Sequence, residues 1–470
     1  MSTTLDQELA AKKSKFLSDL KKGKSNEWII VMGNEAGDLD SLSSSIAYSY
    51  FASSLSSSSS SSYIPLQLTP HSDLYLRPEN LESLSLSNIS LTSLLTLSDL
   101  PPISTLSSSA FESNYVLVDH NSLLPMFRSH DDEGQGDERV VGIIDHHVDE
   151  SLHLDAKPRV IELVGSCSSL VTNEFIPSIT TTSNNNDKEG KDLVLPPKGL
   201  ADLLISSILI DTKLKPLEEG GKATKIDFEA VSKLVPYSSF APPTTSPSQG
   251  GGGGEIGILG NEEVLKGLKE RGNLLGRLKE DVSWMNGRDL LRRDYKEYVS
   301  IDKEGRELKY GLSTVPLGLS VWLEKFQKEK PGKELEEGVL GDLREWMREK
   351  GLALGGVLTS YTHVKRKSGK EGKHRRELLG LTTDQRLGRV VFEGLGRGEE
   401  NVIRVDLELG EWKELKNYGG ESGKDEGESM GEGGQGYERW KVWQQGNTKA
   451  TRKQVAPILK ELVHEALGIQ

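Results

Sequence analysis

The residues WIIVMGNEAGDLDS (28–41) combine a short, strongly apolar run with a turn that is rich in glycine and acids. An apolar run of this length, bounded by turn residues, is typical of a strand that is buried on both faces. In open sheets of parallel strands, ligands bind beyond the carboxyl ends of the strands. Asp38 and Asp40 follow such an end directly. The segment therefore predicts an α/β sheet with a polar site at the tip of this strand.

Short β-branched runs alternate with helical segments from residue 28 to residue 211, which is the pattern of a parallel α/β sheet. The expected strands are 28–33, 63–68, 115–119, 140–145 and 160–164. Segments 42–55 and 198–211 have the apolar density of helices that pack on such a sheet. We therefore expect a doubly wound, mostly parallel sheet in the N-terminal domain.

The rest of the chain has an α+β pattern. We expect helices at 261–282, 288–298, 317–328, 335–350 and 451–468, and strands at 352–364, 376–383, 389–395 and 401–409. Low-complexity segments have the composition of loops, because they cannot offset the entropy of ordering; they are 56–62, 180–192, 242–254 and 419–436. A boundary near residue 280 gives an N-terminal domain of 26–280 and a C-terminal domain of 281–470.

The composition narrows the class of protein. The chain has 470 residues, with 58 Lys and Arg against 71 Asp and Glu, and its net charge is −13. Cys167 is the only cysteine, which excludes a scaffold held by intramolecular disulfides. No apolar run reaches the roughly 18 residues of a membrane helix, and the acidic balance disfavours an extended nucleic-acid surface. We expect a cytoplasmic monomer without a membrane or nucleic-acid partner.

Acids and imidazoles follow three further elements. One strand ends in Asp119-His120-Asn121, another in Asp145-His146-His147, and an apolar helix ends at Asp211. A single acid at such a place is often only a turn or capping residue, but an acid at the end of a helix opposes the helix dipole. Carboxylates with imidazole suit Mg²⁺ or Mn²⁺, and a single thiol argues against a structural zinc site. If these ends converge, they predict a two-cation site for phosphoryl chemistry.

These segments resemble the ordered motifs of the DHH phosphoesterase superfamily. In the first domain the matching segments are GNEAGDLDS (33–41), VDHN (118–121), GIIDHHVDE (142–150), VGSCSSLV (164–171) and the helix that ends at Asp211. In the second domain, LLRRDYKEY (290–298) and ATRKQVAPIL (450–459) resemble the DHH-associated domain of family II inorganic pyrophosphatases, prune-type proteins and yeast-type exopolyphosphatases. The resemblance implies an active site in the cleft between the two domains.

The resemblance also implies two divalent cations, Mg²⁺ or Mn²⁺ and alternatively Co²⁺. In this comparison Asp38 binds one cation, Asp40 binds the other, and Asp119 bridges them. The shell of the second cation is completed by His146 and Asp211.

Further roles follow from the same comparison. His147 matches a histidine that contacts phosphate and is a proton donor to the leaving oxygen, so the implied catalytic residues are His147, Asp119 and Asn34. Lys296, Arg452 and Lys453 match the cationic residues with which the second domain binds phosphate, and Lys449 is a further candidate.

Two positions distinguish the branches of the family. Pyrophosphatases of this type have a histidine where this chain has Asn34, and an amide is a poorer ligand than imidazole for a transition-type ion. Prune-like proteins have an arginine where this chain has His147. The sequence therefore favours an exopolyphosphatase that releases orthophosphate from linear polyphosphate. A pyrophosphatase, a prune-like nucleotide phosphodiesterase and a catalytically weak polyphosphate-binding scaffold remain the alternatives.

The segment THVKRKSGKEGKHRREL (362–378) contains nine Lys, Arg or His residues. A chain of phosphates needs cations along its length, so His363, Lys365, Arg375 and Arg376 are candidates for a channel that binds the distal part of the substrate. A solvated hairpin with alternating charge is the alternative.

Overall fold

The computed structural model divides the chain into two compact units, Met1–Glu280 and Asp281–Gln470. It describes residues 3–55, 62–102, 106, 111–128, 137–176, 194–242, 259–329, 338–364, 371–396, 407–412, 426–430 and 436–469. The four predicted low-complexity loops lie wholly or largely outside the described residues, as do Lys365 and the side chain of His363.

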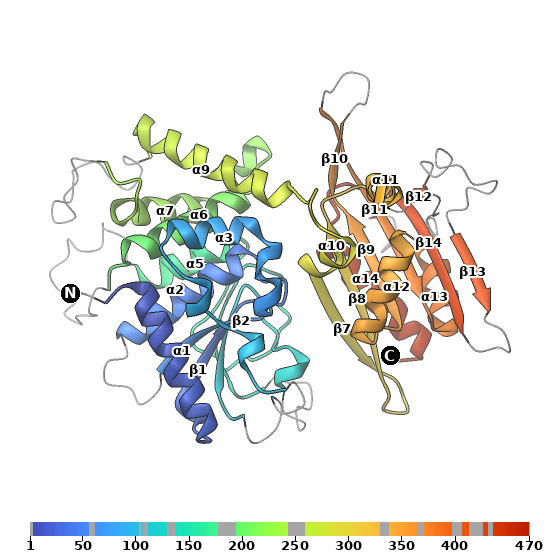
Figure 1. Cartoon of the computed structure of the whole chain (residues 1–470), viewed down its shortest axis with the longest axis horizontal. Coiled ribbons are helices and arrows are strands. Elements are labelled where there is room, and N and C mark those ends of the chain that lie inside the picture. The colour runs from blue at the N-terminus through green and yellow to red at the C-terminus, as the bar shows by residue number, and fades with distance from the viewer. Residues whose placement is uncertain are drawn as a thin grey trace. The chain divides into compact units, whose positions relative to one another are not determined.

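A six-stranded parallel sheet forms the centre of the first unit, with strand order β3-β2-β1-β4-β5-β6 (Figure 1). Its strands are β1 (Trp28–Met32), β2 (Ser62–Gln67), β3 (Leu95–Thr96), β4 (Asn114–Val118), β5 (Val140–Asp145) and β6 (Arg159–Ile161). The order runs outward in both directions from β1, so β1 and β4 meet where the winding reverses, which is the usual ligand position in such sheets. The predicted doubly wound, parallel sheet is thus confirmed.

Both faces of this sheet are buried. Ile29 and Val31 join a core formed with α2 (Leu39–Leu55), α5 (Cys167–Phe175) and α6 (Lys198–Thr212), whereas Ile30 joins a core with Phe16 on the other face. This alternation follows from the twofold period of a strand. The other α-helices in the described part of this unit are α1 (Leu5–Lys21), α3 (Pro78–Leu86), α7 (Lys225–Leu234) and α9 (Glu262–Glu280).

The second unit has an eight-stranded mixed sheet. Six strands follow the order β12-β14-β11-β9-β8-β7, with β10 paired to β11 and β13 paired to β14. β8 and β9 are parallel, and the other pairs are antiparallel. The strands are β7 (Tyr295–Ile301), β8 (Glu307–Val315), β9 (Leu354–Thr359), β10 (Tyr361–Val364), β11 (Glu371–Thr382), β12 (Leu409–Glu411), β13 (Glu426–Met430) and β14 (Tyr437–Gln445).

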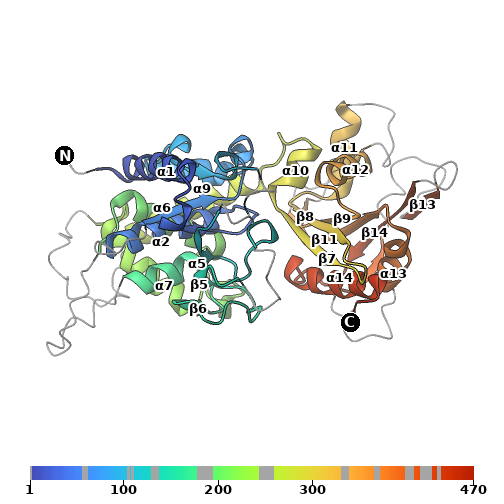
Figure 2. The same ribbon diagram turned by 90° about the horizontal axis from the view of Figure 1, so that it is seen from below.

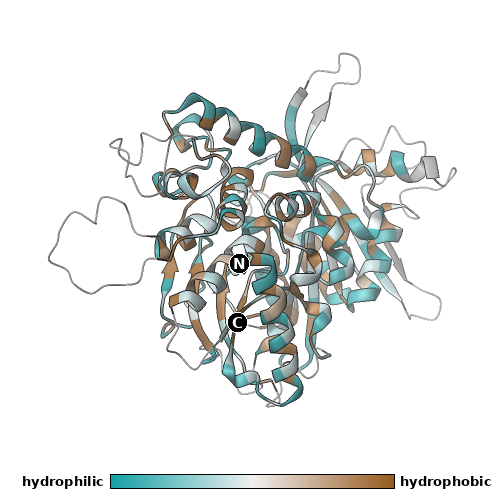
Figure 3. Ribbon diagram, turned by 60° about the vertical axis from the view of Figure 1, so that its left-hand side comes forward, coloured by the Kyte–Doolittle hydropathy of each residue, from teal (hydrophilic) through white to brown (hydrophobic). Residues whose placement is uncertain are grey.

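Helices cover both faces of this mixed sheet, with α11 and α12 on one side and α13 and α14 on the other (Figure 2). The helices are α10 (Gly287–Arg293), α11 (Leu319–Glu329), α12 (Val339–Lys350), α13 (Gln385–Gly396) and α14 (Arg452–Leu467). Brown and teal stretches share the same helices in Figure 3, as expected of helices with one buried face. The α+β character predicted for the C-terminal part is confirmed.

Two predicted elements of the second unit are wrong. The segment 389–395, read as a strand from its Val-Val-Phe run, belongs to helix α13, where Leu387, Val391 and Leu395 are buried at helical spacing. The expected helix 288–298 ends at Arg293, and the chain continues as β7. Within the described parts of the chain, none of the helices has the length and apolarity that crossing a membrane requires.

Candidate metal centre

The turn after β1 is shaped by two glycines. A Cβ on Gly33 would lie 2.3 Å from the Cβ of Ser41, and a Cβ on Gly37 would lie 2.1 Å from Thr69 Oγ1. Gly37 also has a φ of +57°, a conformation in which glycine is favoured. The turn is held from outside by Arg77, whose Nε and a terminal nitrogen donate to Ala36 O at 2.9 and 2.7 Å. The segment 34–38 is therefore fixed beside the tip of β1.

Asp119 lies at the neighbouring strand tip, directly after β4. β1 and β4 pair in parallel register, so Asn34 comes next to Asp119, and its Nδ2 donates to Asp119 Oδ2 at 2.8 Å and to Asp119 O at 3.1 Å. Ser41 Oγ donates to the same Oδ2 at 2.7 Å. Asp119 is almost fully buried and has a φ of +62°, in the left-handed region that Asp and Asn tolerate better than most residues.

The other oxygen of Asp119 faces the two histidines that follow β5. Oδ1 lies 3.2 Å from His146 Nε2 and 3.7 Å from His147 Nδ1. Within the described residues these three side chains form a group whose ligand atoms lie within 4.8 Å of one another. His146 Nδ1 contacts Val164 O at 3.1 Å, and a donor bond from this nitrogen makes Nε2 of the neutral imidazole the nitrogen that can bind a cation.

Asp145 orients His147. Its Oδ1 lies 2.8 Å from His147 Nδ1, and its Oδ2 accepts from Asn121 Nδ2 at 2.6 Å. Burial acts to raise the pKa of Asp145, but the hydrogen bond and charge of His147 outweigh it and hold that pKa well below its usual value. An ionised carboxylate only accepts hydrogen bonds, so Nδ1 of His147 carries the proton and Nε2 is its reactive nitrogen.

Asp40 is embedded in a network of serines. Its Oδ1 accepts from Ser166 Oγ at 2.8 Å, from Ser168 Oγ at 2.7 Å and N–H at 2.9 Å, and from Ser207 Oγ at 2.9 Å. Its Oδ2 accepts from Cys167 N–H at 2.7 Å. The structure thus saturates Oδ1 with donors, and Oδ2 is the oxygen of Asp40 better suited to a cation.

The loop that donates to Asp40 is itself held by a buried carboxylate. Asp227, in α7, accepts from Gly165 N–H at 3.0 Å, from Ser169 Oγ at 2.7 Å, and from the N–H and hydroxyl of Thr224. Asp227 is fully buried. Its bonds fix the start of α5, so its role is to position the donors around Asp40.

Asp38, Asp40, Asp119 and Asp211 interact electrostatically in this part of the first unit. Burial, with the charges of Asp38 and Asp40, raises the pKa of Asp119 against the lowering effect of His146. Burial, again with Asp40 and Asp38, raises the pKa of Asp211 to about 7, although Lys279 acts to lower it. Lys279 Nζ lies 3.4 Å from Asp211 Oδ1. Mutual repulsion among neighbouring acids is the electrostatic condition that a cation relieves.

These residues fit divalent cations. Asp119 Oδ1 and His146 Nε2 face each other, and each is oriented by a hydrogen bond on its other atom, as metal ligands usually are. Asp38, Asp40 and Asp211 add oxygen donors that interact electrostatically with Asp119 or with one another, and oxygen with imidazole ligands suits Mg²⁺ or Mn²⁺. His147 differs, because Asp145 engages its Nδ1.

The second unit brings several predicted phosphate-binding residues near one another. Arg452, at the start of α14, donates to Asp294 O at 2.9 Å and to Asp294 Oδ1 at 2.8 Å, two residues before Lys296 in β7. Arg376 Nε donates to Thr448 O at 2.8 Å, which places it beside Lys449. Lys449 and Lys453 are exposed. Arg375 lies on β11 opposite Tyr361 of β10.

Several residues of the first-unit site carried no assigned role in the sequence prediction. Asn121 and the serines that donate to Asp40 and Asp119 lie within the quoted motifs. Their position beside the predicted ligands is the sequence signal that could have identified them. Arg77, Asp227 and Lys279 come from elements outside those motifs. They act through contacts far apart in the chain, which no local pattern reports.

Comparisons with known proteins agree with this architecture. A model described as the DHH family, N-terminal domain, matches residues 28–208, and a DHHA2 domain model matches residues 274–462. A Schizosaccharomyces pombe protein named as a candidate exopolyphosphatase is 33% identical over 295 residues, which cover 63% of this chain and 65% of that protein. Rat Exopolyphosphatase PRUNE1 is 25% identical over 299 residues, which cover 63% of this chain and 54% of the relative.

The alignments span less than two thirds of either relative's own length. Among solved structures, that of a candidate family II inorganic pyrophosphatase from Methanococcus jannaschii aligns with 92% of this chain and 99% of its own, at 18% identity and a TM-score of 0.48. The two family models together match most of the sequence, one in each structural unit. The chain therefore carries an N-terminal domain of the DHH family followed by a DHHA2 domain.

Proposed function

We propose that the chain is a metal-dependent exopolyphosphatase that releases orthophosphate from the ends of linear inorganic polyphosphate. The observation that carries this proposal is the environment of Asp119, whose Oδ1 faces His146 Nε2 while Asn34 and Ser41 hold Oδ2. The names of the S. pombe and rat relatives support the choice of substrate. We further propose a cytoplasmic monomer that uses Mg²⁺ or Mn²⁺.

Five residues would hold the cations: Asp38, Asp40, Asp119, His146 and Asp211. When bound, the cations would lower the pKa of the attacking water and offset charge on the attacked phosphoryl group. The protein contributes the fixed orientation of these ligands. Asn34 and Ser41 bind one oxygen of Asp119, so the other keeps its direction toward His146.

His147 is proposed to move a proton to the leaving oxygen. Asp145 fixes the tautomer through Nδ1, so the exchange occurs at Nε2. Asn121, which donates to Asp145 Oδ2 and to Val148 O, holds the carboxylate in place.

Lys296, Arg452, Lys453 and Lys449 are proposed to bind the phosphates next to the scissile bond. Internal phosphates of a linear polyphosphate each carry a charge, and cationic side chains bind such oxygens with charge-assisted hydrogen bonds. Arg375, Arg376 and His363 remain candidates for contacts with more distant phosphates.

A substrate panel tests the proposed activity. Orthophosphate release is measured with Mn²⁺ or Mg²⁺ from long-chain polyphosphate, tripolyphosphate, pyrophosphate and a cyclic nucleotide. We expect the highest kcat/KM with polyphosphate chains, because phosphates beyond the terminal one offer further charges for cationic side chains to bind. Turnover confined to pyrophosphate, or to the cyclic nucleotide, would favour the other enzymatic alternatives. Tight polyphosphate binding without release would favour a scaffold.

The raised pKa values of Asp119 and Asp211 predict how cation binding depends on pH. The ordinary aspartate pKa is 3.8, and that of Asp211 is about 7 in the folded protein. An acid with a raised folded-state pKa stabilises the fold below its unfolded pKa, and this contribution is lost as the pH rises through the folded value. The metal-free protein should therefore lose stability between about pH 4 and pH 7, as the buried acids ionise beside one another.

Cations should restore this stability, because they bind the deprotonated ligands. The rise in Tm on adding Mn²⁺ is expected to be larger at pH 7.5 than at pH 5.5. The variant Asp211→Asn should show a smaller difference between the two pH values. An equal rise at both pH values in the unmodified protein would contradict the assignment of these acids as ligands.

A further inference from the structure

Helix α9 packs along α6, with Leu268 and Leu275 in the same hydrophobic core as Leu209. A Cβ added to Gly272 would lie 3.7 Å from the Cβ of Leu209, and one added to Gly276 would lie 4.0 Å from Lys213 Cε. The two glycines are four residues apart, so they lie on one face of α9. At these distances an added Cβ would make ordinary van der Waals contact, so this face of α9 lies against α6.

Lys279 lies three residues beyond Gly276, on the same face of the helix. Its Nζ is 3.4 Å from Asp211 Oδ1, in the last turn of α6. The packing of α9 against α6 therefore places an ammonium group beside one of the proposed ligands. The pair joins two long helices, and the side chains of Lys279 and Asp211 are 37% and 20% exposed.

The ammonium of Lys279 faces several carboxylates besides Asp211. Besides its 3.4 Å contact with Asp211, Lys279 interacts electrostatically with Asp38 and Glu79, and a lysine amine carries a proton at neutral pH. Asp211 in turn interacts with Asp40 and Asp38. Lys279 is thus a protonated, positively charged group that faces the same acids as the proposed cations.

We propose that Lys279 is a built-in competitor for the cation at Asp211 and thereby sets the affinity of that cation. In the metal-free protein its ammonium partly neutralises Asp211 and holds the carboxylate in place. A divalent cation that binds Asp211 must replace the ion pair and also experiences the repulsion of the nearby positive charge. The inference rests on the proposed role of Asp211 as a ligand.

The experiment measures Mn²⁺ binding to the full chain by calorimetry after chelator treatment, without substrate. Lys279→Met removes the charge and is expected to tighten the binding of one of the two Mn²⁺ ions, the one at Asp211, by about ten-fold. An effect of this size is typical of one partly solvated charge a few ångströms away. Lys279→Gln, which keeps a polar end group, should tighten binding in the same direction. Lys279→Arg retains the charge and should remain within about three-fold of the unmodified protein.

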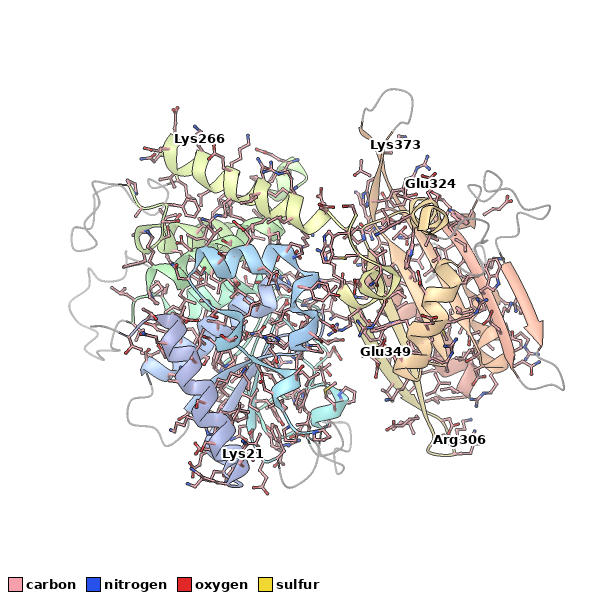
Figure 4. All side chains as sticks on the ribbon, in the orientation of Figure 1. Lys21, Lys266, Arg306, Glu324, Glu349 and Lys373 are labelled. Atoms are coloured by element: carbon pink, nitrogen blue, oxygen red, sulfur yellow. The ribbon has the colours of Figure 1, made fainter. Side chains whose placement is uncertain are left out.

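Lys266→Met is the matched control. Lys266 belongs to the same helix and carries the same charge, but it is 77% exposed and points away from the body of the unit (Figure 4). It lies 13 residues before Lys279, which is roughly 20 Å along the helix. Its removal should leave Mn²⁺ affinity unchanged.

The outcomes separate this inference from the proposed function. If the unmodified protein binds no Mn²⁺, the metal centre itself is refuted. If it binds Mn²⁺ but the Lys279→Met and Lys279→Gln proteins bind with equal or lower affinity, only the competition by Lys279 is refuted. Circular dichroism of each metal-free variant shows whether a change in affinity reflects loss of the fold.

Discussion

Replacing Asp119 with asparagine is expected to lower kcat by ~10³-fold or more while the protein remains folded. Asparagine has the same shape and is one of the few residues that tolerate the left-handed backbone that Asp119 adopts, with a φ of +62°. Its amide oxygen can still accept from Asn34 and Ser41, which now hold Oδ2. The amide nitrogen of the variant then faces His146, in the position that Oδ1 of Asp119 occupies in the unmodified protein. The variant therefore lacks the negatively charged oxygen that would bind the cation.

Stability measurements distinguish this loss from unfolding. Burial and the neighbouring acids raise the pKa of Asp119, so a neutral amide relieves repulsion. The metal-free Asp119→Asn protein should therefore unfold at or above the temperature of the unmodified protein, and Mn²⁺ should raise its Tm less. Asp155→Asn makes the same chemical change at an exposed site of the same unit and should alter neither quantity. Turnover within ten-fold of the unmodified protein would refute the bridging role.

The strands that build the first unit were predictable because their sequence is dominated by burial. β1, β2, β4 and β5 are short apolar runs between turn residues, and each lies within a residue or so of its expected place. A parallel sheet covered on both faces needs such continuous apolar strands. The order of the strands then follows from right-handed crossovers and brings β1 and β4 together.

The second unit was harder to predict, because its strands mix charged and apolar residues. In β7, Tyr295 is buried while Lys296 and Glu297 are half-buried, and both of these charged residues also favour helices. Pairing with β8 along the whole strand decides the outcome. The sequence pattern did not predict strands β8 and β14. In α13 the error is the reverse, because a strand was predicted where the chain forms a helix: the helical spacing of its buried residues outweighs the β propensity of Val and Phe.

At the site, sequence reasoning found the acids and imidazoles but not the groups that orient them. Strand ends can be located from local pattern, and the topology then gathers them at one edge of the sheet. The bonds from Ser166 and Ser168 to Asp40, and the ion pair of Lys279 with Asp211, join residues more than 60 positions apart. Such contacts depend on helix packing, for which a single sequence gives no periodic signal.

Replacing His147 with glutamine is expected to lower kcat by about 10²–10⁴-fold, the range typical of lost general acid–base catalysis. A glutamine amide can still bond to Asp145, but it cannot deliver a proton to the leaving oxygen. KM should change much less than kcat, because the proton is transferred in the transition state and the ligands of the cations are unchanged. The measurement is steady-state orthophosphate release from polyphosphate at saturating Mn²⁺.

Two comparisons test whether the effect belongs to His147 as a proton donor. His71→Gln removes an exposed histidine of the same unit and should leave kcat unchanged. Asp145→Asn should reproduce part of the defect, because a neutral amide stabilises the protonated imidazolium of His147 less than a carboxylate does, and this imidazolium is the form that gives up a proton from Nε2. A His147→Gln protein that loses affinity for substrate but keeps its kcat would show that the histidine only binds phosphate. The Asp145–His147 hydrogen bond would then have no part in proton transfer.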